Sequence, residues 1–266
     1  MKIEKVDKIQ INDYLDYTGK EIDGVIKEIL DTIELRGDIY YAGHEKKEWI
    51  KMTLERFMPN YSNESKIIYP LENDREIARR ICIYALEKQK ELFNFAHVFL
   101  FPCFSDFVNE KMSGVTGYCS RENVLLIFIN FNGNWKKGLN SVVLHELAHS
   151  VSKFYNGGLV SIGEGMIFDG LAEHYRESVL RDGKSPLVTG LKKEEADKIF
   201  EELRDKLNSE TLKDYTDVFF GTGKYPTWTG YILGYNLITK FLKEKDNIDW
   251  YEILRMDPKI ILKKVI

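Results

Sequence analysis

Residues 145–149 contain two histidines and a glutamate whose types and spacing suit metal chemistry. The segment reads His-Glu-Leu-Ala-His, so His145 and His149 are four residues apart with Glu146 between them. On a helix, residues four apart project from the same face, and two imidazoles placed in this way can bind one zinc ion. The carboxylate between them can then take a proton from a metal-bound water. This motif predicts one Zn2+ per chain, with His145 and His149 as ligands and Glu146 as the general base.

A catalytic zinc usually has a third protein ligand, and the segment from Ile167 to Tyr175 offers two candidates. Asp169 and Glu173 are again four residues apart, so they share a helix face. One of them can bind zinc, while the other can accept a hydrogen bond from a ligating histidine. An alternative interpretation is a solvated helix face with acidic residues near its start. Glu164 is a weaker candidate, because it lies in a Gly-Glu-Gly sequence that we expect to be a turn.

Hydrolysis of a peptide also requires a hydrogen-bond donor to the oxyanion that forms. Tyr231 and Tyr235, four residues apart on an expected helix, are the candidates for this role, although both also fit a packed core. Gly230 and Gly234 alternate with them and suggest close packing of this helix against another element. His174 is expected to be a packed or exposed histidine rather than a site residue.

Two of these segments resemble the gluzincin group of HExxH zinc metallopeptidases. These are HELAH at residue 145 and the sequence GLAEH that begins at Gly170. The closest resemblance is to a bacterial family described as predicted zinc-dependent proteases of unknown function, and it covers roughly the last 170 residues. Gly117-Tyr118-Cys119 and the segment from Pro226 to Tyr235 also resemble this family.

The resemblance implies a third ligand at residue 169, where the family has glutamate and this chain has aspartate. Aspartate binds zinc but is one methylene shorter. The preferred interpretation is that Asp169 is the ligand and that Glu173 supports a ligating histidine. The alternatives are that Glu173 is the ligand or that the metal site is weakened or lost.

The surrounding sequence predicts an α+β fold that is mostly helical. Apolar residues at three- and four-residue spacing predict helices, whereas short aromatic and β-branched runs predict strands. The expected strands are 96–104 and 123–131, and residues 113–118 and 132–134 are expected to be turns. The expected helices are 45–58, 74–95, 141–155, 165–181, 192–207 and 229–243. A loop at 59–65 is expected between the first two helices. For helix 141–155, we expect an N-terminal cap at Asn140 or Ser141 and an end at residues 156–158.

We expect a single zincin-like domain over residues 1–266, in which a small mixed sheet packs on the HExxH helix. Residues 1–95 form a mainly helical N-terminal part, and residues 96–266 form the core with the metal site. In gluzincin-like folds an edge strand near this helix often pairs with an extended substrate. Strand 123–131 or strand 96–104 can take this role, although the apolar character of 123–131 equally fits a central, buried strand.

Composition excludes several other classes of function. The formal net charge is -4 and there is no long basic run, so nucleic acid is not expected as a partner. The longest apolar run is too short to span a membrane, and no signal peptide is recognisable, so a cytoplasmic location is expected. The three cysteines lack metal-ligand spacing and are expected to be ordinary, mostly buried thiols. The oligomeric state is not predicted.

These observations predict a zinc-dependent peptidase that acts on peptide or protein substrates. Two alternatives are kept. The first is a non-catalytic peptide-binding or regulatory module that retains the zincin fold, which the aspartate at residue 169 leaves open. The second is a zinc hydrolase of a non-peptide amide.

Overall fold

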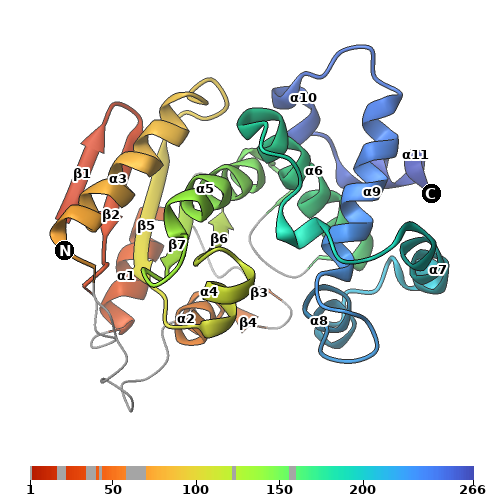
Figure 1. The fold of residues 1–266 in the computed structure, drawn as a ribbon, viewed down its shortest axis with the longest axis horizontal. Coiled ribbons are helices and arrows are strands. Elements are labelled where there is room, and N and C mark those ends of the chain that lie inside the picture. Colours follow the sequence, from red (N-terminus) through yellow and green to blue (C-terminus); the bar gives the residue numbers. More distant parts are fainter. Residues whose placement is uncertain are drawn as a thin grey trace. The chain divides into compact units, whose positions relative to one another are not determined.

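The computed structural model describes residues 2–16, 22–33, 40–41, 44–57, 70–121, 124–155 and 160–266. The chain forms two compact units, Met1–Ser150 and Val151–Ile266. The first unit contains a mixed sheet with helices, and the second is helical in its described part (Figure 1). This is an α+β chain, as expected. The prediction of a single domain over residues 1–266 stays a prediction.

The main sheet has five strands among the described residues, in the order β1-β2-β5-β7-β6. Strands β2, β5 and β7 run parallel to one another, whereas β1 and β6 pair antiparallel at the two edges, so the sheet is mixed as predicted. The strands are β1 (Lys2–Val6), β2 (Ile9–Asp13), β5 (Ala96–Pro102), β6 (Val115–Arg121) and β7 (Val124–Ile129), and a separate pair is β3 (Tyr40–Tyr41) with β4 (His44–Glu45).

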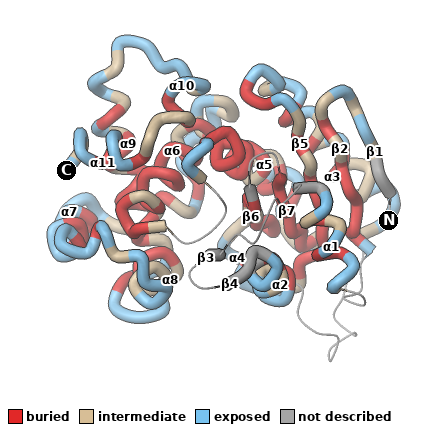
Figure 2. The backbone as a smooth tube through the Cα atoms, turned by 180° about the vertical axis from the view of Figure 1, so that it is seen from behind, coloured by how far each residue is buried: buried red, intermediate tan, exposed pale blue. Residues whose placement is uncertain are grey.

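Side chains alternate between the two faces of this sheet. Phe99 of β5 and Phe128 of β7 belong to one apolar cluster with Ile26 of helix α1 (Ile22–Ile33) and Leu54 of helix α2 (Lys46–Phe57). The opposite face carries helix α3 (Glu72–Glu87), whose Arg79 pairs with Asp13. Every residue of β7 is buried, which fits a central strand covered on both faces. Figure 2 shows β5 and β7 as mostly buried segments.

Three features of the sheet correct the sequence predictions. The part of the chain before residue 96 was expected to be mainly helical, with no strand predicted, but it contains the β1–β2 hairpin. Residues 115–118 were predicted as part of a turn but begin β6; the turn is confined to Ser113 and Gly114, both with positive φ. Strands 96–104 and 123–131 are both internal, so the interpretation of 123–131 as a central strand is confirmed and the edge-strand role is wrong for both.

The HExxH helix is α5 (Trp135–Val151), which begins six residues earlier and ends four residues earlier than predicted. Asn140 and Ser141 therefore lie inside the helix and do not cap it. Gly138 lies inside this helix, and its lack of a side chain allows the close approach of Ser113, since a Cβ would be 2.6 Å from the Ser113 carbonyl oxygen. After Val151, the hydroxyl of Ser152 accepts a hydrogen bond from the Phe154 amide in a turn. The predicted stop at 156–158 and the loop at 59–65 lie outside the described residues.

The second unit is built around two helices, α6 (Ile162–Leu180) and α9 (Thr229–Lys243). Their backbones lie in close contact, because a Cβ on Gly234 would be 2.0 Å from the carbonyl oxygen of Met166. Helix α9 has the bounds that were predicted. The remaining helices are α7 (Lys193–Leu203), α8 (Leu212–Phe220), α10 (Trp250–Leu254) and α11 (Pro258–Val265), with α4 (Asp106–Lys111) in the first unit.

Several helix bounds differ from the predictions. Helix α3 ends at Glu87 rather than continuing to residue 95, and residues 88–91 form turns. Helix α7 ends at Leu203 and is followed by a short 3-10 helix, Arg204–Lys206. Helices α1, α4, α8, α10 and α11 were not predicted. Within the described ranges, no helix is both long and apolar enough to cross a membrane.

Candidate metal centre

Helix α5 holds the three residues of the HExxH motif on a buried surface. His145, Glu146 and His149 are 7%, 6% and 5% exposed. Leu147 and Val143 are fully buried on the same helix, so α5 is covered around most of its circumference. A buried site of this kind strengthens the electrostatic interactions of any charge held there.

The two imidazoles face each other across one turn of α5. Their Nε2 atoms are 3.1 Å apart, and the rings are nearly perpendicular. Two nitrogen ligands about 2.05 Å from a tetrahedral zinc lie about 3.3 Å from each other. The spacing of the Nε2 atoms therefore fits a shared metal ion.

Glu146 lies on the part of α5 that faces strand β6. Gly117 of β6 is so close that a Cβ built on it would be 2.5 Å from Cγ and 2.7 Å from Oε1 of Glu146. The edge strand of the sheet thus runs directly past the candidate general base.

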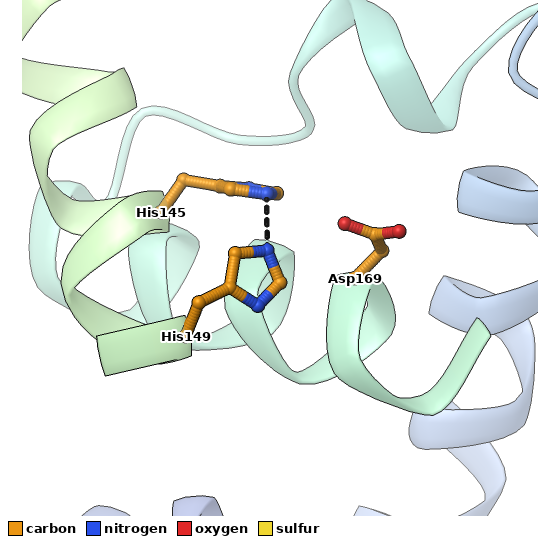
Figure 3. A group of neighbouring side chains, drawn as sticks. All are labelled: His145, His149 and Asp169. Atoms are coloured by element: carbon orange, nitrogen blue, oxygen red, sulfur yellow. Dashed lines mark hydrogen bonds between the residues drawn. The ribbon is translucent and has the colours of Figure 1, made fainter. Parts of the chain in front are cut away.

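Asp169 of α6 completes a group of three possible metal ligands. Its carboxylate and the ring nitrogens of His145 and His149 offer ligand atoms that all lie within 4.8 Å of one another. Figure 3 shows the carboxylate of Asp169 directed toward the two imidazoles. All three residues are buried, and two imidazoles with one carboxylate form a common ligand set of catalytic zinc. The donor set therefore fits the expected zinc.

Glu164 has a structural role at the start of α6. Its carboxylate accepts hydrogen bonds from the backbone amide of Ser161, at 3.2 Å, and from the Ser161 hydroxyl, at 2.6 Å. In return, the Glu164 amide donates to the Ser161 hydroxyl, which completes a capping box. The Ser-x-x-Glu spacing in the sequence signals this cap, and it places the start of α6 three residues before the predicted one.

Glu173 lies one turn after Asp169 but is not a member of the three-residue group. Its Oε2 is 3.4 Å from Nε of Arg176, and both side chains are almost completely buried. Arg176 also donates to Asp182 at 2.7 Å and to the Gly183 carbonyl. Sequence reasoning missed Arg176, although its spacing of three residues from Glu173 is that of a helical ion pair. The choice between Asp169 and Glu173 as the ligand stays a prediction.

Tyr231 and Tyr235 both lie on α9 but in different surroundings. The Tyr235 hydroxyl donates to Glu177 at 2.6 Å, and its ring stacks on His174 with centroids 4.0 Å apart. Burial and the neighbouring Glu177 carboxylate raise the pKa of Tyr235. The Tyr231 ring packs edge-on against Phe219. Their proposed role as oxyanion donors stays a prediction.

His174 is a packed residue, which is one of the two environments expected for it. Its Nε2 lies 3.0 Å from both the Tyr235 carbonyl and the Thr239 hydroxyl. Burial lowers the pKa of His174, because it disfavours the charged form of the ring.

One comparison with known proteins identifies a family. A family model described as "Predicted Zn-dependent protease (DUF2268)" matches residues 78–263, which is more than half of the chain. The match includes the HExxH helix, strand β6, helix α6 and helix α9. Neither the curated proteins nor the solved structures include a significant match to this sequence.

Proposed function

Because the chain belongs to the family of predicted Zn-dependent proteases, we propose that it is a zinc-dependent peptidase of the gluzincin type. The observation that carries this proposal is the buried group of His145, His149 and Asp169, with Glu146 next to the first histidine. The main sheet with α5 would then be the zincin-like core of the enzyme. The expected cytoplasmic location stays a prediction.

In this mechanism His145, His149 and Asp169 would hold the metal. Bound zinc would supply Lewis-acid chemistry, which polarises a carbonyl and lowers the pKa of water. Glu146 would accept a proton from the attacking water and return it to the leaving amine. The low exposure of Glu146 keeps bulk water away from this proton transfer.

A donor to the oxyanion is required besides the metal, and the two tyrosines of α9 are not equivalent candidates. Tyr235 already donates its hydroxyl proton to Glu177, so using it would cost that hydrogen bond. Both tyrosines stay candidates within this proposal.

The position of β6 supports an extended peptide as the substrate. Among the described strands β6 pairs only with β7, so it forms one edge of the sheet. An extended peptide can add to such an edge through main-chain hydrogen bonds. Because Gly117 of β6 lies against Glu146, a peptide paired with this strand would run close to the general base. We therefore propose that β6 is the edge strand that pairs with an extended substrate, a role that the sequence analysis gave to strand 96–104 or strand 123–131.

The first prediction concerns Glu146→Gln. This variant should keep its zinc and lose hydrolysis by at least about 100-fold, because the amide keeps the shape of the side chain but cannot accept the proton. The measurement is metal-dependent cleavage of a diverse peptide library, read by mass spectrometry, with elemental analysis of zinc in the same preparation. Glu164→Gln is the matched control, since Glu164 serves the helix cap, and it should retain cleavage.

Full cleavage by Glu146→Gln would rule out this mechanism. Peptides that stay intact with the wild-type protein but bind it measurably would instead favour the non-catalytic binding module. Cleavage confined to non-peptide amides would favour the second alternative, a zinc hydrolase that acts on such amides.

A further inference from the structure

Gly117 lies in the middle of the edge strand β6, and its bare Cα faces helix α5. In the β6–β7 ladder Gly117 is the partner of Ile127, so both point to the same face of the sheet. A Cβ on Gly117 would be 2.5 Å from Cγ of Glu146, 2.7 Å from its Oε1 and 2.7 Å from Cγ1 of Val142. These separations are far below the contact distance of about 3.5 to 4.0 Å between carbon atoms.

The need for glycine here is one of space and not of backbone conformation. Gly117 is absent from the residues with positive φ, which include Gly114 three residues earlier in the chain. An alanine can therefore adopt the backbone of β6 at this position, but its methyl group would overlap the side chain of Glu146. The atoms that would have to move are the candidate base and Val142, which lies one turn before it on α5.

Neither His145 nor His149 supplies any of the three heavy atoms that would lie nearest to a Cβ at residue 117. The three nearest atoms all belong to Glu146 and Val142. A methyl group at this position would therefore meet the carboxylate of the candidate base and Val142 first. We expect the displacement to be larger at Glu146 than at the imidazoles of His145 and His149.

We propose that Gly117 is a positioning residue for the reaction: the absence of a side chain on this strand residue keeps the Glu146 carboxylate at the place where it can act as the base. This inference rests on the proposed function, because it assigns the role through Glu146. Gly117 itself touches neither metal nor water in this scheme.

The test is Gly117→Ala in the zinc-loaded full chain. Zinc per chain should equal that of the wild type, and kcat for peptide cleavage should fall by about 10- to 100-fold, the effect of misplacing a catalytic group by about 1 Å. Gly24→Ala is the control without a clash, because a Cβ on Gly24 meets nothing within 4 Å. Gly163→Ala is the control with a clash elsewhere, since its Cβ would be 2.6 Å from Leu262. Unchanged kcat in Gly117→Ala would overturn the proposal.

A double-mutant cycle with Glu146→Gln distinguishes positioning from general damage to the fold. If Gly117 acts through the base, Gly117→Ala should not further reduce the residual activity of Glu146→Gln, because the base is already lost. An equal fall in both backgrounds, or loss of zinc in Gly117→Ala, would show a structural role and overturn the proposal.

Crystal structures of the wild type and of Gly117→Ala provide a readout that does not depend on activity. The carboxylate of Glu146 should be displaced in the variant while the two imidazoles superpose. An undisplaced carboxylate would overturn the inference. If the wild type hydrolyses no peptide, the proposed function fails, and these structures still decide whether Gly117 sets the position of Glu146.

Discussion

Asp169 is the residue on which the proposed metal site depends most. Its carboxylate lies within 4.8 Å of ring nitrogens of both histidines, although aspartate has a shorter reach than the glutamate expected at this position. Gly170, the next residue, lies against the backbone of Gly234, so α6 packs closely against α9 next to Asp169. Glu173 is engaged with Arg176, which gives it a structural partner of its own.

We expect Asp169→Asn to bind zinc at least about 100-fold more weakly, because even residues that only support a ligand cost 10- to 100-fold when changed. The comparison variant is Glu173→Gln, which should weaken zinc binding less than Asp169→Asn does, by no more than the roughly 10- to 100-fold expected for a supporting residue. Competition with a chromophoric chelator measures both affinities. The opposite pattern, with zinc lost in Glu173→Gln and kept in Asp169→Asn, would make Glu173 the ligand.

His145 and His149 were predicted from ligand types at a four-residue spacing, a local rule that holds wherever a helix forms. Asp169 was preferred over Glu173 because of the family resemblance. The structure brings these three residues together, and their role in binding metal stays a prediction. The contact of Gly117 with Glu146 depends on the packing of β6 against α5 and has no local signal. The hydrogen bond from Tyr235 to Glu177 joins residues 58 apart, and it also could not be anticipated from spacing.

At the scale of elements, two glycines set how closely α6 and α9 approach. A Cβ on Gly170 would be 2.4 Å from the Gly234 carbonyl oxygen, and a Cβ on Gly234 would be 2.0 Å from the Met166 carbonyl oxygen. Both obstacles are backbone atoms, which cannot turn away as a flexible side chain can. The sequence predicted that Gly230 and Gly234 mark close packing of this helix. At Gly234 this prediction is confirmed, and the element that packs closely there is the backbone of α6.

Gly234→Ala should lower the free energy of unfolding by about 1–3 kcal/mol, the usual cost of overpacking, even though alanine is the better helix former. Urea unfolding of the zinc-free protein measures this without a contribution from metal binding. Gly24→Ala in α1, which has open space for a methyl group, should be neutral or stabilising by up to about 1 kcal/mol. A Gly234→Ala variant as stable as the wild type would contradict the close packing of α6 with α9.

The elements that the sequence predicted well are those with strong local patterns. Helix α9 and strands β5 and β7 have long apolar runs or clear periodicity. Strand β6 was hidden because its glycine and polar residues resemble a turn, and only its pairing with β7 makes it a strand. The first turns of α5 were not predicted from the sequence, and they contain Gly138, which packs closely against Ser113.

At the scale of the whole molecule, the family match and the metal-ligand group point to the same activity. The matched residues, 78–263, include every residue of the proposed mechanism. The hairpin β1–β2 and helices α1 and α2 lie before the match, and they complete the sheet and cover one of its faces. Their contribution within the proposal is to support β5 and β7, beside which the edge strand β6 is placed.

Zinc content tests the central claim most directly. Untagged protein purified without chelator, and its His149→Ala variant, would be measured by mass-spectrometric elemental analysis. The account predicts close to one zinc per wild-type chain and close to none in the variant, which lacks one of two imidazole ligands. A wild-type value near zero that persists after zinc is added would contradict the account and favour a binding module without metal.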